Sequence, residues 1–267
     1  MIVWALLSCL AHAEVVRVSP QGATATLAAG RDRVRELRTQ GERGPIEVEF
    51  AAGTYAQTEA VAFTAADSGA TYRAAPGAKV IFSGGRKIEG WQEKDGIWQA
   101  KLPDAGWRFE QLWVNGRRAR VARTPNVGYF NALAPANKET FADLNEPNFQ
   151  AFIARPKDFA VLQAIPKSER SDVLLTVMQT WTVGQCRIEA LNEEVNGIRI
   201  VGRARYPFVQ YEPDQRWYLE NYRAALDEPG EWFLDRDGWV YYKPLAGEQI
   251  ADLEAIAPVA EKLLTID

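Results

Sequence analysis

The stretch that decides the fold reads Val173-Leu-Leu-Thr-Val-Met-Gln-Thr-Trp-Thr182, and a second apolar run follows it over residues 185–191. The second run leads through Asn196-Gly197 into Ile198-Arg199-Ile200-Val201. Asn-Gly supplies the positive-φ positions that a tight hairpin turn requires. The stretch therefore predicts consecutive antiparallel strands joined by short turns.

Three further dipeptides of this kind lie outward from that stretch. Asp95-Gly96, Asn115-Gly116 and Asp237-Gly238 each separate two short runs that are typical of strands. This density of hairpins predicts a small antiparallel barrel or sandwich over residues 91–247. Within it, residues 132–167 are rich in Asn, Pro and Asp, and we expect a loop there with one or two helical turns near 148–153.

The preceding residues have a different pattern. Leu27, Val34 and Leu37 recur at roughly helical spacing and predict one amphipathic helix over residues 24–41. Short strand-like runs separated by turn signals follow it, at residues 46–50, 61–63, 71–73 and 79–82. They are too closely spaced for βαβ units and suit the coils of a parallel β-helix.

Short apolar strands return at residues 255–259 and 263–267. A fold that ended there would present an uncapped β edge, which natural proteins avoid. The expected fold class is all-β, in four segments. These are a signal peptide (1–13), amino-terminal β-helix coils with a capping helix (14–90), an inserted antiparallel barrel (91–247) and a truncated resumption of the β-helix (248–267).

Residues 1–13 form an apolar run that ends in Ala11-His12-Ala13, the small-x-small pattern that signal peptidase requires. We expect cleavage before Glu14 and a secreted or periplasmic protein. Two alternatives stay open for this run, a lipoprotein acylation box around Cys9 and a first buried strand or helix.

The charge balance limits the partners. The chain has 31 Lys and Arg against 35 Asp and Glu, a formal net charge of −4, which argues against nucleic acid and anionic membrane surfaces. No later stretch approaches the ~20 apolar residues of a membrane span.

His12 is the only histidine of the sequence, so cleavage would leave a mature chain with none. This excludes Ser-His-Asp and Cys-His nucleophile systems and His-ligated metals. We expect no cofactor and no metal, and acid–base chemistry would need carboxylates, Lys or Tyr. Cys186 is expected to be a small buried residue, not a nucleophile.

Several segments in this order resemble one family. They are Phe50-Ala-Ala-Gly-Thr-Tyr55, Asp67-Ser-Gly69, Ile81-Phe-Ser-Gly-Gly85 with Ile88-Glu-Gly-Trp91, Gln111-Leu-Trp-Val-Asn-Gly116, Arg216-Trp-Tyr-Leu-Glu-Asn221 and Leu226-Asp-Glu-Pro-Gly-Glu-Trp-Phe-Leu-Asp235 with Trp239-Val-Tyr-Tyr-Lys-Pro244. The set is similar to the amino-terminal part of secreted bacterial right-handed parallel β-helix proteins related to glycoside hydrolases, of the α-galactosidase and fucosidase/xylanase kind.

The resemblance implies a β-helix that a barrel interrupts, with catalytic carboxylates on later coils. No catalytic residue carries over to this sequence, because the matching positions are absent from it. The resemblance therefore implies a polysaccharide or oligosaccharide partner, with catalysis beyond Asp267 and a chain that is inactive by itself.

Three residues are candidates for substrate binding. Trp181 and Trp217 border turns or loops, where an aromatic ring can stack on a sugar. Glu220 is expected to face the same side of a strand as Tyr218.

Two other functions stay open, polysaccharide lyase-like cleavage and a non-catalytic carbohydrate-binding or surface role. The sugar, the linkage and the oligomeric state are not predicted.

Overall fold

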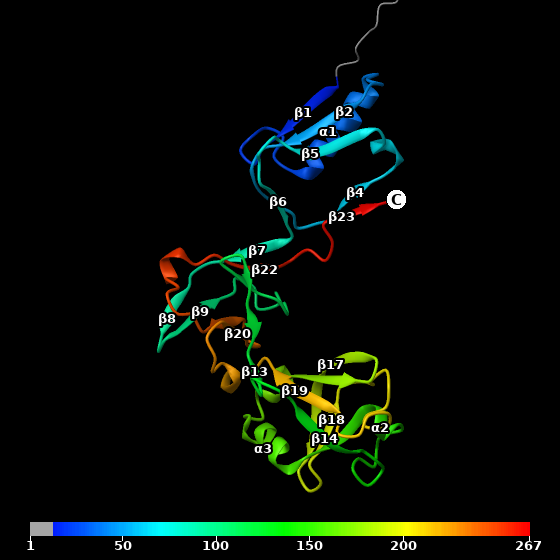
Figure 1. Ribbon diagram of the computed structural model, residues 1–267, viewed down its shortest axis with the longest axis vertical. Coiled ribbons are helices and arrows are strands. Elements are labelled where there is room, and N and C mark those ends of the chain that lie inside the picture. Colours follow the sequence, from blue (N-terminus) through cyan, green and yellow to red (C-terminus); the bar gives the residue numbers. More distant parts are fainter. Residues whose placement is uncertain (1–12) are drawn as a thin grey trace, which may run out of the picture. The chain divides into compact units, whose positions relative to one another are not determined.

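The computed structural model describes residues 13–267 (Figure 1). The predicted signal peptide therefore lies outside the described residues, apart from Ala13, and it stays a prediction. The chain divides into two compact units. The first contains residues 13–87 and 256–267, and the second contains residues 88–255.

The first unit contains a three-stranded parallel sheet with one helix. The strands are β1 (Glu14–Val18), β2 (Ile46–Phe50) and β5 (Ala70–Ala74), in the order β1-β2-β5, and the helix is α1 (Leu27–Thr39). The side chains of Ile46, Val48 and Phe50 are buried because alternate residues of a strand point to the same face.

Helix α1 is shorter than the predicted range, but its existence and its buried face are confirmed. It begins after Thr26, whose Oγ1 accepts a hydrogen bond from the Ala29 amide at 3.0 Å. It ends just before Gly41, which has a φ of +99° that glycine adopts readily. Leu27, Val34 and Leu37 are buried, as their spacing predicts.

The remaining strands of the first unit form two small parallel sheets. Strand β3 (Gly53–Ala56) pairs with β6 (Val80–Ser83), and β4 (Val61–Phe63) pairs with β23 (Leu264–Ile266). A single 3₁₀ turn lies at Ala65–Asp67. Strands β7 (Gly85–Ile88) and β22 (Ala255–Pro258) lie where the chain passes from one unit to the other.

The prediction of right-handed parallel β-helix coils over residues 14–90, resuming over 248–267, is wrong. The structure has several separate small sheets in place of a coil stack, and a closed antiparallel barrel is its principal feature. The physical reason is that short apolar runs between turns do not determine which strand each run pairs with. The all-β class is confirmed.

The second unit contains the hairpins that the Asp-Gly and Asn-Gly dipeptides predict. One five-stranded sheet has the order β12-β20-β21-β9-β8, with bounds Arg120–Val121, Glu231–Leu234, Trp239–Tyr242, Ile97–Lys101 and Gln92–Lys94. Strands β10 (Trp113–Val114) and β11 (Arg117–Arg118) form a hairpin at Asn115-Gly116. Asp95 and Gly96 both have positive φ, as a tight turn requires.

The rest of the second unit is a closed barrel of six antiparallel strands, which confirms the predicted β-barrel insert. Around the ring the strands are β14 (Phe130–Pro135), β15 (Ala151–Ala154), β18 (Gly197–Ile200), β17 (Thr182–Asn192), β16 (Leu174–Gln179) and β19 (Arg216–Glu220). Strand β19 pairs with both β16 and β14, which closes the ring. Strand β13 (Arg123–Thr124) adds to β19.

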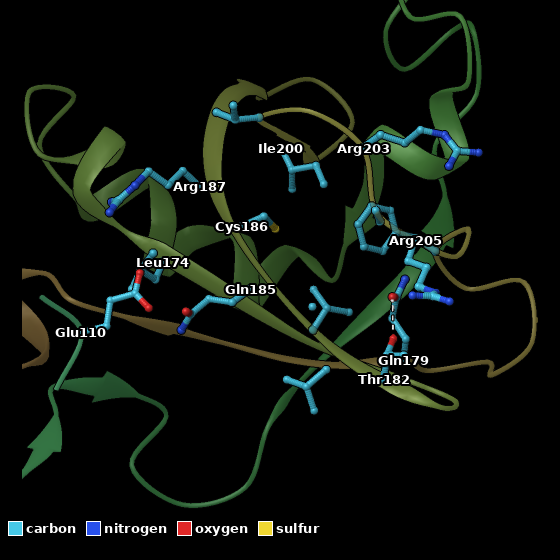
Figure 2. Close-up of a pocket in the computed structure, with 16 residues that line it drawn as sticks. Glu110, Leu174, Gln179, Thr182, Gln185, Cys186, Arg187, Ile200, Arg203 and Arg205 are labelled. Atoms are coloured by element: carbon cyan, nitrogen blue, oxygen red, sulfur yellow. Dashed lines mark hydrogen bonds between the residues drawn. The ribbon is translucent and has the colours of Figure 1, made fainter. Parts of the chain in front are cut away.

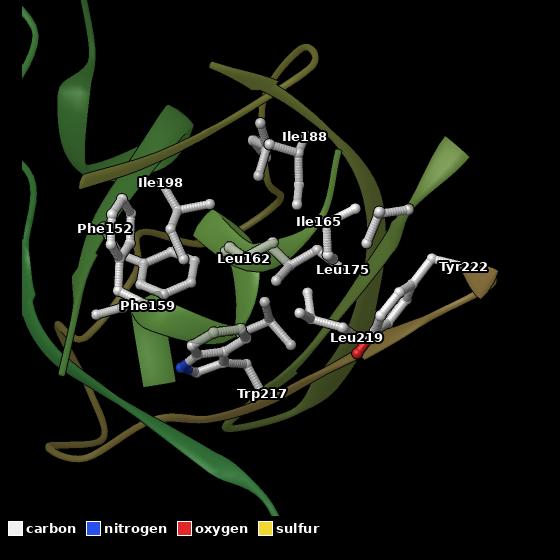
Figure 3. Close-up of a cluster of buried hydrophobic side chains, with 14 of the residues drawn as sticks. Phe152, Phe159, Leu162, Ile165, Leu175, Ile188, Ile198, Trp217, Leu219 and Tyr222 are labelled. Carbon is white, nitrogen blue, oxygen red and sulfur yellow. The ribbon is translucent and has the colours of Figure 1, made fainter. Parts of the chain in front are cut away.

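Large apolar side chains fill the barrel (Figure 3). Leu175 and Trp217 point inward, and the Trp217 ring centroid lies 4.7 Å from that of Phe130 and 5.6 Å from that of Phe152. Helix α3 (Pro156–Ala164) adds the buried side chains of Phe159 and Leu162. The barrel therefore has a packed core that holds its wall in place.

The expectation that residues 132–167 form a loop is only partly correct. Strand β14 begins at Phe130, and residues 147–164 contain the short helix α2 (Pro147–Gln150), strand β15 and helix α3. Some of the buried residues of these strands are small, such as Ala132 and Ala154. The strands therefore lack the alternation of large apolar and polar residues by which a strand is predicted from sequence. Other single 3₁₀ turns lie at Arg170–Asp172, Arg223–Ala225 and Ile250–Asp252.

Between residues 13 and 267, no helix combines the length and the apolar character that crossing a bilayer requires.

Two leucines of the barrel provide a matched test of the core. Leu175 is completely buried, whereas the Leu133 side chain on β14 is 57% exposed. We expect Leu175→Ala to lower the free energy of unfolding by about 2–5 kcal/mol, because it removes buried methylene groups and leaves a cavity. Leu133→Ala should change it by less than about 0.5 kcal/mol. Urea denaturation of both variants checks this, and equal losses would contradict the inward assignment of Leu175.

Candidate functional site

Three aromatic side chains gather at the turn between β16 and β17. Trp181 lies on this turn, and 67% of it is exposed. Its ring centroid lies 5.7 Å from that of Tyr206 and 5.5 Å from that of Tyr211, which is itself exposed. We call these three residues the exposed aromatic group. An exposed apolar surface of this kind marks a binding site more often than a scattered single residue does.

A pocket of about 670 Å³ opens in the barrel wall beside this turn (Figure 2). Strand β17 pairs with β18 only from Ile188 onward, and just beyond this pairing the Val201 amide donates to the Arg187 carbonyl oxygen at 2.9 Å. The first residues of β17, 182–186, have no strand partner on that side. After Ile200 the chain leaves β18 and continues through residues 201–208. The pocket lies between these two segments and reaches core residues of the barrel such as Val177 and Phe208.

One buried glutamine joins the pocket to the exposed aromatic group. The Gln179 Nε2 donates a hydrogen bond to the carbonyl oxygen of Tyr206 at 2.7 Å. The Thr182 Oγ1 donates to the Gln179 Oε1 at 3.2 Å, the bond drawn in Figure 2. Gln179 and Thr182 both line the pocket, and Trp181 lies between them in the chain. The turn and the 201–208 segment are thus held together.

The charged side chains of the pocket are three arginines and one glutamate, namely Arg187, Arg203, Arg205 and Glu110. Arg203 forms an ion pair with Glu146, with Nε and Oε2 2.7 Å apart, and this hydrogen bond holds the pKa of Glu146 below its usual value. The Arg187 Nη1 donates to the carbonyl oxygen of Asp172 at 3.1 Å. The pocket lining is therefore positive overall.

Cys186 lies in the middle of the pocket lining. Burial raises the pKa of its thiol to about 12, and its Sγ lies 3.5 Å from the carbonyl oxygen of Leu175, to which it donates. The thiol stays protonated near neutral pH, which agrees with the expectation that it is not a nucleophile.

Glu220 and Tyr218 lie on the outer face of the barrel. The alternate residues of the same strand, Trp217 and Leu219, are buried inside, and successive side chains of a strand point to opposite faces. Its Oε2 accepts hydrogen bonds from Thr176 Oγ1 at 2.9 Å and Gln185 Nε2 at 3.2 Å. Burial raises the pKa of Glu220 above its ordinary value, although both hydrogen bonds act to lower it.

The β16–β17 hairpin connects Glu220 with the pocket. Thr176 and Gln185 are directly paired residues of this hairpin, and Gln185 also lines the pocket. Figure 2 shows Gln185 beside Glu110 at the end of the pocket away from Arg205. Trp181 lies at the turn of the same hairpin. One hairpin therefore carries both Trp181 and the partners of Glu220.

Trp217 is not part of this site. None of it is exposed, and its ring packs against Phe130 and Phe152 in the barrel core. The prediction that Trp217 is a platform for a sugar ring is wrong, because neither face of the ring is accessible. The pattern of the sequence placed it near a loop but did not show that strand β19 directs it inward.

Sequence reasoning missed the residues that the 201–211 segment contributes. Arg205, Tyr206 and Tyr211 lie in a segment without strand or helix. The available signal was the combination of arginine and tyrosine in a turn-rich stretch between two predicted strands. That signal gives composition alone and does not show that the segment folds back over β17.

In the part of the chain that the structure describes, no group of three His, Cys, Asp or Glu side chains is placed to hold a metal ion.

Comparison with known proteins gives one family and one close structural match. Residues 95–245 match the family model described as the GH141 insertion domain. A solved structure described as a glycoside hydrolase is 27% identical, with a TM-score of 0.81 over 96% of this chain and 48% of that one. The chain thus spans about half the length of that structure. No curated protein matches it.

A second solved structure matches much more weakly. It is the tailspike of Acinetobacter baumannii bacteriophage AP22 in complex with a capsular saccharide of the host. The identity is 8% and the TM-score 0.21, over 72% of this chain and 24% of the tailspike, a score too low to indicate a shared fold.

The raised pKa of Glu220 predicts a pH-dependent effect of Glu220→Gln. A carboxyl whose pKa is higher in the folded state contributes stability at pH values below its unfolded pKa, and this is lost as the pH rises through the folded pKa. The neutral amide keeps its shape and does not ionise. We therefore expect this variant to gain stability relative to wild type as the pH rises from about 4 to about 7.

Urea denaturation at several pH values measures this difference, with the exposed Glu139→Gln as the matched control. A difference that stays constant with pH for Glu220→Gln, or an equal trend for Glu139→Gln, would contradict the prediction.

Proposed function

This chain belongs to the GH141 insertion-domain family, and from that premise we propose that it binds a polysaccharide or oligosaccharide within a glycoside hydrolase-like protein. The observation that carries the proposal is the exposed aromatic group beside the pocket of the barrel wall. The match to a structure described as a glycoside hydrolase supports the same substrate class.

The exposed aromatic group suits a sugar ring for a physical reason. One face of a pyranose ring presents C–H groups, and an aromatic ring can cover them while the hydroxyl groups stay free to form hydrogen bonds. Trp181 and Tyr211 are largely exposed, so their rings are accessible to such a ligand. Polar side chains of the pocket, including Thr182 and Gln185, are available for the hydroxyl groups.

Glu220 is proposed as a second contact for the same ligand. Both hydrogen bonds that it accepts from Thr176 and Gln185 are on Oε2. Its Oε1 is therefore the oxygen with capacity for a ligand hydroxyl. The shared partner Gln185 lines the pocket, which supports a binding surface that extends along the β16–β17 hairpin.

We propose further that hydrolysis by the whole protein depends on carboxylates outside residues 13–267. Two observations support this. The matching family model describes an insertion domain, and the chain covers 48% of the glycoside hydrolase that it matches. Glycoside hydrolases require two carboxyl groups at a fixed separation across the scissile bond.

Replacing Trp181 should weaken glycan binding. We expect Trp181→Ala to raise the Kd for the bound oligosaccharide about tenfold, since it removes the exposed ring and its apolar contact area. Trp181→Phe, which keeps an aromatic ring, should lose less, and Leu133→Ala on the same barrel should have no effect. Isothermal titration calorimetry with xylo-, galacto-, manno- and uronic acid oligosaccharides measures this.

Unchanged binding by Trp181→Ala would reject the exposed aromatic group as the binding surface. The absence of binding to every member of the panel would reject the proposed function.

The chain alone should not hydrolyse glycosides. We expect no release of p-nitrophenol from p-nitrophenyl α- and β-glycosides above the enzyme-free rate, because the proposed catalytic carboxylates are not in residues 13–267. Turnover that Glu220→Gln abolishes would contradict this and would make Glu220 a catalytic residue.

A further inference from the structure

We propose that Arg205 makes the pocket selective for sugars that carry a carboxylate, a refinement that rests on the proposed carbohydrate-binding function. Arg205 lines the pocket, and its guanidinium carbon lies 5.8 Å from the ring centroid of Tyr206. Tyr206 in turn contacts Trp181. A sugar that stacks on the exposed aromatic group would therefore meet a positive charge at its edge.

The charge of Arg205 is not neutralised within the described residues. The ion pairs of the second unit include Arg203 with Glu146 but none with Arg205, which is exposed. The carboxylate of the pocket lining, Glu110, lies at the opposite end from Arg205 in Figure 2. An arginine without an acidic partner at the edge of a pocket attracts an anionic ligand.

The other two arginines of the pocket have other roles. Arg203 is engaged by Glu146 through two hydrogen bonds and by the Phe149 ring, 4.0 Å from its guanidinium carbon. Arg187 donates to backbone carbonyl oxygens of the turn that contains Asp172. Both are anchored by the protein, so Arg205 is the arginine that can reorient toward a ligand.

The segment that carries Arg205 is fixed in place. Gln179 holds the carbonyl oxygen of Tyr206 at 2.7 Å, immediately after Arg205 in the chain. The guanidinium group thus starts from an anchored backbone beside the turn of Trp181. The positive lining also contrasts with the formal net charge of −4 of the whole chain, so an acidic ligand is favoured here and not over the surface in general.

A carboxylate suits the guanidinium group of Arg205 better than the other anionic groups that sugars carry. The planar guanidinium offers two parallel N–H donors that match the two oxygens of a carboxylate. A uronic acid carries its carboxylate in the plane of the ring edge, so the ring can stack on Trp181 while the carboxylate reaches Arg205. A sulfate ester can also accept from both N–H groups, but a freely rotating ester oxygen separates it from the ring, so holding it at this edge costs more conformational entropy.

The test compares acidic and neutral forms of the same sugars. The probes are trimers of galacturonate, glucuronate and mannuronate, their carboxyl-reduced neutral counterparts, and a sulfated galactose trimer, each titrated calorimetrically into the chain. We expect at least one acidic trimer to bind about tenfold or more tightly than its neutral counterpart, and more tightly than the sulfated trimer. Arg205→Gln should remove this preference by lowering the affinity for the acidic trimer to that for its neutral counterpart.

Two further variants control for charge. Arg118→Gln removes the same charge from the exposed strand β11 outside the pocket, and it should keep the preference. Arg205→Lys keeps the positive charge but loses the two parallel N–H donors of the guanidinium, so it should keep only part of the preference.

Equal binding of acidic and neutral trimers would overturn the proposal while leaving carbohydrate binding intact. A preference that survives Arg205→Gln would overturn the role of Arg205, and equally tight binding of the sulfated trimer would overturn the selectivity for carboxylates. Failure of every trimer to bind would overturn both this proposal and the proposed function.

Discussion

The pairing of one strand with two others is the constraint on which the second unit depends. Strand β19 pairs with β16 on one side and β14 on the other, which closes six strands into a ring. Because side chains alternate across a strand, closure fixes Trp217 and Leu219 inside and Tyr218 and Glu220 outside. A shift of one residue would exchange the two sets, so the apolar core and the position of Glu220 follow from the same register.

The candidate site lies where strand β17 extends beyond its pairing with β18. Strand β17 has 11 residues and its neighbour β18 has four, so part of β17 has no partner on that side. The pocket occupies this gap. A difference in strand length therefore creates a pocket without any break in the closed ring, and the packed core of the barrel lies on the inner side of that pocket.

The sequence predicted well what depends on neighbouring residues. Asp95-Gly96 and Asn115-Gly116 have the positive φ values of hairpin turns because this preference is local, and the spacing of Leu27, Val34 and Leu37 predicts helix α1 for the same reason. The barrel insert follows from the number of such hairpins. Trp181 lies on a turn, as its place in the sequence indicates, and its role in binding stays a prediction.

The errors concern distant contacts. The pairing partners of the short amino-terminal strands are not encoded in their apolar pattern, so the β-helix prediction failed. Trp217 lies next to a loop in the sequence, but β19 turns it into the core. Arg205 and Tyr206 join the site through contacts between residues far apart in the sequence, among them the bond from Gln179 to the Tyr206 carbonyl oxygen. The bond from Gln179 also has an energetic consequence: it holds the backbone at Tyr206 in place in advance, so a ligand bound at this surface would lose less conformational entropy in ordering the segment, and more of the contact energy would remain as affinity.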